Sequence, residues 1–292
     1  MEDKLAQARA RFAEDLRVAA GVRTHAIIAA FARVPREAFV GPPPWRVGTR
    51  FTRLGGPLLE YQTFEGDPAV LYHDVVVALD EQRAINNGQP SLWAWAFQET
   101  QPRSGDRILH LGCGTGYYTA ILAEIAGPNG SVHGIEVEPA LAERARNALV
   151  SWANVTVACG DGITVPPEAW DLIAVSAGAT HPLLGWLAGL KPNGRLLFPL
   201  TVDTPNPRSG SGAMLLLSRR GDGLFAASFL CPASFVHFEG GRDPEAGARL
   251  LQALRHGFQK ASEVHSLRQD RHVQDESCWL HADAFCLSYR DP

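Results

Sequence analysis

A glycine loop in the middle of the chain is the stretch best suited to hold a ligand. The segment HLGCGTGYYTA joins an apolar run to an amphipathic one, which predicts a strand, a loop and the start of a helix. Backbone N–H groups at such a junction face the ligand, because the first N–H groups of a helix have no partner within it. Tyr117 stands where a dinucleotide-binding G-x-G-x-x-G loop needs its third glycine, so the spacing is G-x-G-x-G instead. The loop comprises Gly112, Cys113, Gly114, Thr115 and Gly116.

Two carboxylates end the next two predicted strands. Glu136, in HGIEVE, lies at the end of a predicted strand about 20 residues past the glycine loop, where an acid can accept hydrogen bonds from both hydroxyls of a ribose. Asp161, in ACGDG, ends the following strand, where it can accept from an adenine amino group; an ordinary turn is the alternative. The G-x-G-x-G spacing is that of S-adenosylmethionine methyltransferases. With these acids it predicts a pocket for S-adenosyl-L-methionine and for the product S-adenosyl-L-homocysteine. We expect this pocket to be lined also by Val137, Gly162 and Ser176.

The elements that position these residues alternate in type from Arg107 onward. Apolar strands such as RILHL, SVHGIEVE and WDLIAVS are separated by amphipathic helices such as TAILAEIAG and PALAERARNALVSW. This alternation predicts an α/β fold with a doubly wound parallel sheet, whose ligand site lies at the carboxyl ends of the strands. AMLLLSRR and LFAASFLCPASFV then predict a hairpin, and CWLHADAFCLSY predicts one further strand. Before Arg107, the helical spacing of apolar residues predicts two helices, the second capped by Thr24.

Composition and charge argue against several classes of function. The chain has 292 residues, 46% of them hydrophobic and 20% charged, and a formal net charge of −4, so no electrostatic attraction to nucleic acid is expected. No apolar run reaches the about 18 residues of a membrane-spanning helix, and the charged start of the chain lacks the apolar core of a signal peptide. We therefore expect a cytoplasmic protein with neither a nucleic-acid nor a membrane partner.

The five cysteines contain no C-x-x-C pair, and their odd number argues against a disulfide framework. Cys278 and His281 have the spacing of half a metal site, but no second close pair completes it. The sequence therefore leads us to expect no metal.

From the second predicted helix onward, the chain resembles protein-L-isoaspartate (D-aspartate) O-methyltransferases. The shared elements, over residues 25–240, are FARVPREAFV, GCGTGYYTAILAE, GIEVEPALAERARNAL, GDG, GRLLFPL and AMLLLSRRGDGLFAASFLCPASFV. The resemblance implies a Rossmann-like methyltransferase with S-adenosyl-L-methionine as methyl donor, Glu136 as the ribose partner and Asp161 as the adenine partner. It also implies three parts, which are an N-terminal helical cap and acceptor-side lid (1–100), a Rossmann-like methyltransferase core (101–240) and a C-terminal extension with an added strand (241–292).

The acceptor side departs from this family in the stretch INNGQPSLWAWAF. The family covers its reaction centre with a Gly-Gln-Thr-Ile-Ser-x-Pro loop, whereas here Pro90 follows Gln89 directly and the Thr-Ile-Ser core is missing. Ser91 is a displaced substitute for the family's serine. Segment 71–83 looks like an insertion, and His110 stands where the family usually has an acid. The cofactor half is therefore expected to be intact and the acceptor half altered.

Methyl transfer to a carboxylate needs little side-chain chemistry, because a carboxyl group with a pKa near 4 is already anionic at pH 7. Gln89 and Ser91 would then orient the acceptor, whereas a hydroxyl or amine acceptor would need a base such as His181, in SAGATHP. We expect an O-methyltransferase that acts on an aspartyl or isoaspartyl carboxylate of a protein or peptide, with poor general isoaspartyl repair activity because the lid is short. The alternatives are the same fold with a different acceptor, such as a small metabolite or a dedicated peptide, and a non-catalytic adenosyl-binding module.

Overall fold

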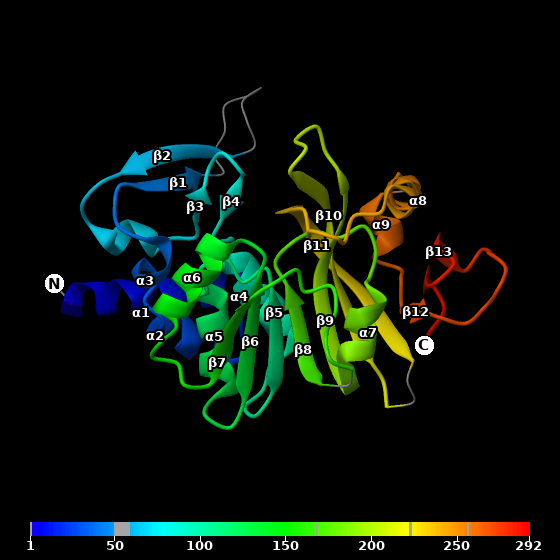
Figure 1. Cartoon of the computed structure of the whole chain (residues 1–292), viewed down its shortest axis with the longest axis horizontal. Helices are drawn as coiled ribbons and strands as arrows, with labels where there is room; N and C mark the ends of the chain where they lie inside the picture. Colours follow the sequence, from blue (N-terminus) through cyan, green and yellow to red (C-terminus); the bar gives the residue numbers. More distant parts are fainter. Residues whose placement is uncertain (1, 50–58, 168, 222–223, 256) are drawn as a thin grey trace. The chain divides into compact units, whose positions relative to one another are not determined.

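The computed structural model describes the chain except for residues 1, 50–58, 168, 222–223 and 256 (Figure 1). It divides into two compact units. The first contains residues 1–105, 113–134 and 138–158, and the second contains residues 106–112, 135–137 and 159–292. Among the helices of the described residues, none is long and apolar enough to cross a membrane.

The first unit is built mainly of helices. Their bounds are α1 (Glu2–Ala19), α2 (His25–Arg33), α3 (Glu37–Val40), α4 (Pro90–Thr100), α5 (Tyr117–Ala126) and α6 (Pro139–Ala148). The two predicted N-terminal helices are confirmed, and Phe12 and Leu16 of α1 are buried. Thr24 occupies the N-cap position of α2, but its side chain makes no capping hydrogen bond. Helix α5 is buried on nearly all sides, since its sequence YYTAILAEIA is almost entirely apolar.

The first unit also holds a small antiparallel sheet with the strand order β2-β1-β3-β4. The bounds are β1 (Trp45–Thr49), β2 (Glu60–Phe64), β3 (Val76–Asp80) and β4 (Ile85–Asn86), and the 3-10 helix η1 (Pro68–Leu71) precedes β3. Trp45, Leu71 and Val77 are buried in the core of this sheet. The Asn87 N–H donates to the Val77 carbonyl at 3.0 Å, so the sheet holds the chain just before α4 begins.

A ten-stranded sheet has the order β13-β14-β12-β11-β10-β9-β8-β5-β6-β7. Its longer strands are β5 (Arg107–Leu111), β6 (Ser131–Glu136), β7 (Val155–Cys159), β8 (Trp170–Val175), β9 (Leu190–Asp203), β10 (Ser209–Arg219) and β11 (Phe225–Val236), with α7 (Leu184–Gly189) between β8 and β9. Strand β8 pairs in parallel with β5 and β9, as the alternation of strands and helices predicts. This parallel pairing confirms the predicted α/β class. Strand β10 pairs antiparallel with β9 and β11, and the pair β10–β11 confirms the predicted hairpin.

The C-terminal extension adds more than the single strand that its alternating pattern predicts. It contains α8 (Pro244–Leu254), α9 (Phe258–Ala261), β12 (Ser266–Arg268), β13 (Cys278–His281) and β14 (Cys286–Ser288). The stretch CWLHADAFCLSY forms a hairpin of two antiparallel strands, because the Ala282 N–H donates to the Phe285 carbonyl at 3.0 Å and the chain reverses there. The alternation of apolar residues continues across this turn, so the pattern alone does not reveal it.

Candidate active site

The carboxyl ends of β5, β6 and β8 meet within the second unit. The Gly112 N–H donates to the Ile135 carbonyl at 2.8 Å, and the Ser176 N–H donates to the last carbonyl of β5 at 2.8 Å. The Gly160 N–H donates to the Glu136 carbonyl at 3.0 Å, which ties the chain after β7 to the end of β6. This edge of the sheet, where a ligand is expected in such folds, carries Gly112, Glu136, Val137, Asp161, Gly162 and Ser176.

The two predicted adenosyl anchors differ in burial. Glu136 is only 6% exposed, whereas Asp161 is exposed and accepts the Ile163 N–H at 2.9 Å through Oδ1. Asp161 therefore closes a turn, which is the alternative that the sequence left open, while its carboxylate stays accessible to a ligand. Gly162 follows with a φ of +66°, and a Cβ there would lie 2.8 Å from a leucine of β5, so this position requires glycine.

His110 lies on β5 where the family resemblance implies an acid. Its imidazole is almost fully buried and lies 2.9 Å from the Ser176 Oγ, at the end of β8. Burial lowers the pKa of His110 to about 4, because a charged ring loses its hydration in the interior. The ring is therefore neutral at pH 7, and the site gains a neutral hydrogen-bonding pair in place of a carboxylate.

The glycine loop requires glycine for its backbone conformation and, at one position, for packing. Gly112, Gly114 and Gly116 have φ values of +68°, +57° and +95°, a region that L side chains rarely adopt. Within the first unit, a Cβ at Gly116 would lie only 2.6 Å from Leu149 Cδ1. At Gly114 the nearest atom, on Leu79, would be 3.7 Å away. Gly116 is therefore needed for packing, whereas Gly114 leaves space beside the loop.

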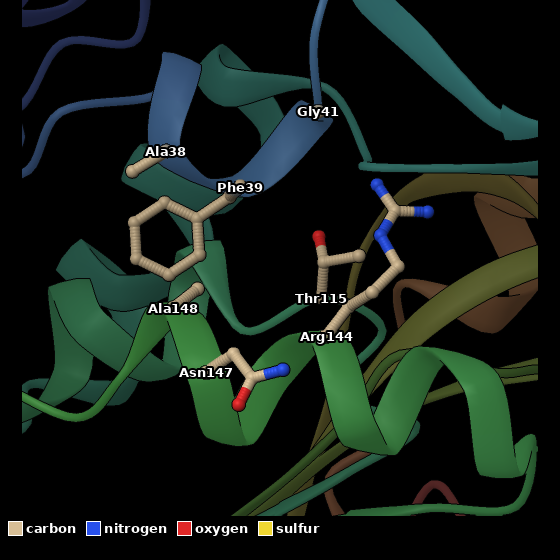
Figure 2. A pocket seen from close by; sticks show the side chains of 7 residues that line it. All are labelled: Ala38, Phe39, Gly41, Thr115, Arg144, Asn147 and Ala148. Carbon is tan, nitrogen blue, oxygen red and sulfur yellow. The ribbon is translucent and has the colours of Figure 1, made fainter.

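Thr115 faces a pocket of about 320 Å³ between α3 and α6, inside the first unit (Figure 2). The other lining residues are Ala38, Phe39, Gly41, Arg144, Asn147 and Ala148. Figure 2 shows the Arg144 side chain extending past Thr115 toward Gly41. Thr115 as a whole is only 3% exposed.

The lid residues Gln89 and Ser91 are held by a carboxylate that lies outside the lid. The Ser91 N–H and Oγ–H donate to the Asp74 carboxylate at 2.8 and 2.7 Å, and the Gln89 Nε2 donates to it at 2.7 Å. Asp74 thereby caps α4, whose own N-cap residue, Gln89, makes no side-chain capping bond. No motif in the sequence indicates Asp74 as the partner of Gln89 and Ser91, because it lies within the apparent insertion.

A buried arginine of the family's VPRE element holds the segment that carries Asp74. Arg36 is 0% exposed, and its guanidinium donates to the carbonyls of Leu71, His73 and Val75 at 2.7, 3.1 and 2.5 Å. It also donates to the Asn87 Oδ1, at the start of the lid, at 3.2 Å. Arg36 thus fixes both chain segments whose side chains meet in the lid.

The lid is also tied to α5, the helix that follows the glycine loop. The Tyr118 hydroxyl donates to the Gly88 carbonyl at 3.1 Å, and the ring centroids of Tyr118 and Trp93 are 5.2 Å apart. Gly88 has a φ of +74°, and a Cβ there would lie 2.8 Å from the Trp93 Nε1. The stretch NNGQP is therefore a tightly packed turn, and Trp93, which is 1% exposed, belongs to the core.

His181, the third predicted catalytic residue, lies in the second unit after β8, whereas Gln89 and Ser91 lie in the first. Its Nδ1 is 3.0 Å from the Thr180 Oγ1. Burial lowers the pKa of His181, an effect that Asp243 opposes. The ring is thus neutral at pH 7 and able to accept a proton.

Sequence comparisons connect the chain to one family. Residues 60–242 match the family described as Protein-L-isoaspartate(D-aspartate) O-methyltransferase (PCMT). A protein-L-isoaspartate O-methyltransferase of Methylorubrum extorquens is 34% identical over 234 residues, which cover 79% of this chain and 88% of the relative. A second relative of that name, from Aeropyrum pernix, is 31% identical over 209 residues and 70% of each chain.

Two solved structures share the fold. One, named protein-L-isoaspartate O-methyltransferase, has a TM-score of 0.62 at 23% identity and covers 85% of this chain and 69% of its own. The other is a putative protein-L-isoaspartate O-methyltransferase of Plasmodium falciparum in complex with S-adenosyl-L-homocysteine, with a TM-score of 0.58 at 16% identity over 79% of this chain and 97% of its own. They confirm the predicted methyltransferase fold.

Proposed function

We propose that the acceptor of this protein is an aspartyl or isoaspartyl carboxylate of a peptide or protein. The chain belongs to the protein-L-isoaspartate (D-aspartate) O-methyltransferase family and is an S-adenosylmethionine-dependent methyltransferase. The observation that carries this proposal is the convergence of three hydrogen-bond donors of Gln89 and Ser91 on one carboxylate, that of Asp74. A substrate carboxylate has the same acceptor atoms in the same planar arrangement, so these donors suit it equally well.

Asp74 competes with a substrate for these donors. It accepts bonds from the Gln89 Nε2, the Ser91 N–H and the Ser91 Oγ–H, so an acceptor carboxylate must displace an anion of the chain itself. Such a displacement raises KM for a small peptide that brings few other contacts. We therefore infer poor activity on simple isoaspartyl peptides and better activity on an acceptor that contacts more of the surface.

The residues of the donor side fit S-adenosyl-L-methionine. Glu136 is a buried carboxylate at a strand end and would accept hydrogen bonds from the ribose hydroxyls, while Asp161 would accept from the adenine amino group. Gly114 leaves room for a ligand beside the loop, because the nearest atom to a Cβ there is 3.7 Å away. When bound, the cofactor supplies a methyl group on a positively charged sulfonium.

The transfer needs no general base, because the acceptor carboxylate is anionic at pH 7. One carboxylate oxygen forms the new O–C bond as the S–C bond breaks, which gives a methyl ester and S-adenosyl-L-homocysteine without a proton transfer. The side chains of this protein therefore act by orientation and by exclusion of water. Gln89 and Ser91 are proposed to orient the acceptor.

A hydroxyl or amine acceptor, in a small metabolite or a dedicated peptide, is the second candidate. The observation that favours it is the half-buried His181, whose pKa is lowered by burial and whose ring is neutral at pH 7. A His181→Asn variant should keep its methylation of carboxylates and lose that of hydroxyls or amines. Equal rates on all acceptor classes would remove His181 from consideration as a base.

The proposed acceptor is tested by kcat/KM for methyl transfer from a labelled donor to a short isoaspartyl peptide. We expect this protein to be about 100-fold less efficient than the Methylorubrum extorquens relative, a loss typical of a misplaced acceptor. Asp74→Ala should raise kcat/KM about tenfold, the equivalent of one charge-assisted hydrogen bond. Glu65→Ala, which removes another exposed carboxylate of the first unit, is the matched control and should change nothing.

Two results would contradict this account of the acceptor side. Wild-type efficiency equal to that of the relative would show that Asp74 does not obstruct the donors. A Ser91→Ala variant that binds cofactor and methylates the peptide at an unchanged rate would show that Ser91 does not orient it. The cytoplasmic location and the absence of a nucleic-acid partner stay predictions.

A further inference from the structure

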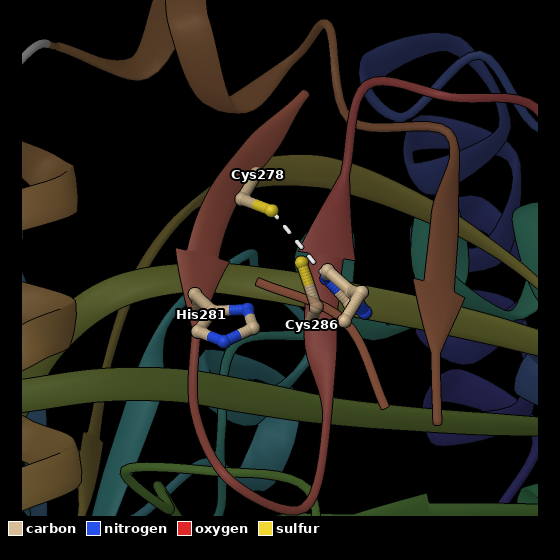
Figure 3. Close-up of side chains that lie close together, drawn as sticks. Cys278, His281 and Cys286 are labelled. Carbon is tan, nitrogen blue, oxygen red and sulfur yellow. Dashed lines mark hydrogen bonds between the residues drawn. The ribbon is translucent and has the colours of Figure 1, made fainter. Parts of the chain in front are cut away.

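Four metal-ligating side chains of the C-terminal extension converge on one point. They are His272, Cys278, His281 and Cys286, and one ligand atom of each lies within 4.8 Å of all the others. Figure 3 shows Cys278, His281 and Cys286 pointing toward a common centre between β13 and β14. All four belong to the second unit, and none is among the residues to which the methyl-transfer mechanism assigns a role.

The hairpin explains how residues with unremarkable spacing meet. His281 and Cys286 are directly paired across β13 and β14. Cys278 and His281 are three residues apart, and in a regular strand their side chains would point to opposite faces. The register shifts between Cys278 and Leu280, and such an irregularity reverses the alternation. Both side chains can therefore face the Cys286 thiol.

The fourth side chain, His272, is oriented as metal-bound histidines are. Its Nδ1 is 3.0 Å from the Asp270 carbonyl, which selects the tautomer whose Nε2 is free to bind a metal. This Nε2 lies 3.5 Å from the Cys278 Sγ. The backbone N–H of Asp275 donates to the same sulfur at 3.4 Å.

An unsatisfied nitrogen gives independent support for a ligand at this point. The Nδ1 of His281 is buried and has no hydrogen-bond partner among the described residues. A buried polar atom without a partner destabilises the fold, so its position calls for an explanation. A metal ion bound by this nitrogen would supply one.

We propose that His272, Cys278, His281 and Cys286 bind one structural zinc ion. Two thiolates and two neutral imidazoles offset the charge of Zn²⁺, and four protein ligands without an open position are typical of structural sites. In a tetrahedral zinc site, neighbouring ligand atoms lie about 3.3–3.8 Å apart. The ligand atoms here lie within 4.8 Å of one another, so side-chain shifts of about 1 Å would bring them to that separation. Cys286 is 1% exposed, and the other three side chains are partly buried.

The zinc ion would add to the apolar packing of Trp279, Leu280 and Leu287 in a part of the chain that is built from short strands. Strand β13 is the edge of the ten-stranded sheet, β12, β13 and β14 are three or four residues long, and His272 precedes the hairpin in an irregular segment. Binding free energy at such a site adds directly to folding free energy. The site is thus proposed to fix the extension to the sheet, independently of the acceptor chemistry.

The test is the metal content of the purified full chain, measured by inductively coupled plasma mass spectrometry, together with cobalt substitution. We expect about one zinc per chain, and the visible absorption of tetrahedral, thiolate-bound cobalt after Co²⁺ is added to the stripped, reduced protein. Cys278→Ser and Cys286→Ser should lose both signals. Cys159→Ser removes an exposed cysteine at the end of β7, outside the cluster, and should keep both.

The proposal is overturned if the stripped, reduced wild type gives no thiolate–cobalt absorption. It is equally overturned if Cys278→Ser keeps its metal, or if thiol titration of the unreduced, unfolded protein reveals a disulfide between Cys278 and Cys286. His272→Gln serves as a second variant in case the cysteine variants do not fold. It should bind cobalt more weakly while circular dichroism shows an unchanged fold.

Discussion

Replacing Glu136 with alanine should weaken the binding of S-adenosyl-L-homocysteine far more than the same change at Asp161. Glu136 is 6% exposed, whereas Asp161 is exposed and one of its carboxylate oxygens already accepts a hydrogen bond from the Ile163 N–H. Hydrogen bonds to a charged group contribute about 1.5–3 kcal/mol, and solvent competes for an exposed one. We expect a loss of about 3 kcal/mol, or roughly 150-fold in Kd, at Glu136 and of about 1 kcal/mol, or roughly fivefold, at Asp161.

Isothermal titration calorimetry with S-adenosyl-L-homocysteine measures both values. Glu136→Gln keeps the shape of the side chain and removes its charge, so its Kd should lie between those of the wild type and Glu136→Ala. Glu143→Ala, which removes an exposed carboxylate of α6, is the control and should bind like the wild type. Circular dichroism establishes that each variant is folded.

Two outcomes would refute this reasoning. If Asp161→Ala loses more affinity than Glu136→Ala, burial does not set the strength of the two anchors. If both variants bind as tightly as the wild type, the edge of the sheet formed by β5, β6 and β8 is not the adenosyl site.

Three further predictions concern the scaffold around the site. The imidazole of His110 binds a proton near pH 6.5 in the unfolded protein but only near pH 4 in the folded protein. The free energy of unfolding should therefore fall by about 3 kcal/mol as the pH drops from 6.5 to 4. Urea unfolding that shows the same loss in His110→Gln would contradict this. Gly114→Ala and Gly116→Ala should both lose stability, because alanine rarely adopts their positive φ, at a cost of about 1–2 kcal/mol. Gly116→Ala should unfold more readily than Gly114→Ala because its Cβ would also meet Leu149 at 2.6 Å. Thermal melts compare the two variants, and equal melting temperatures would argue against the packing role. Arg36→Leu should lower the free energy of unfolding by at least about 3 kcal/mol, because the carbonyls of Leu71, His73 and Val75 lose their donor. A loss under about 1 kcal/mol in chemical denaturation would refute this.

The cofactor side of the site could be predicted from local sequence because each of its parts is local. The glycine loop joins a strand to a helix within 11 residues, HLGCGTGYYTA, and Glu136 ends the next strand. In a parallel sheet, the carboxyl ends of neighbouring strands come to one edge whatever the intervening helices contain. Alternation of strands and helices was therefore enough to place Glu136, Asp161 and Ser176 together.

The acceptor side could be predicted only in outline. The direct Gln89–Pro90 junction showed that the lid departs from the family, but nothing near it in the sequence indicated its partner. Asp74 reaches Ser91 across 17 residues of sequence, and Arg36 reaches Val75 across 39. Such bonds depend on how two segments pack, and no periodicity or spacing records them.

The sequence by itself determined the fold class, the donor and the family, because repeated patterns of apolar residues and a short loop motif specify them. The tertiary structure alone decided which carboxylate occupies the lid donors and which histidines and cysteines of the C-terminal extension meet. His272 and Cys286 are separated by a loop, a strand and a turn, and a register shift in β13 turns Cys278 to the face of His281. A shift of one residue reverses the face of every side chain beyond it, so a difference that is invisible in the sequence pattern decides whether four ligands can surround one metal ion.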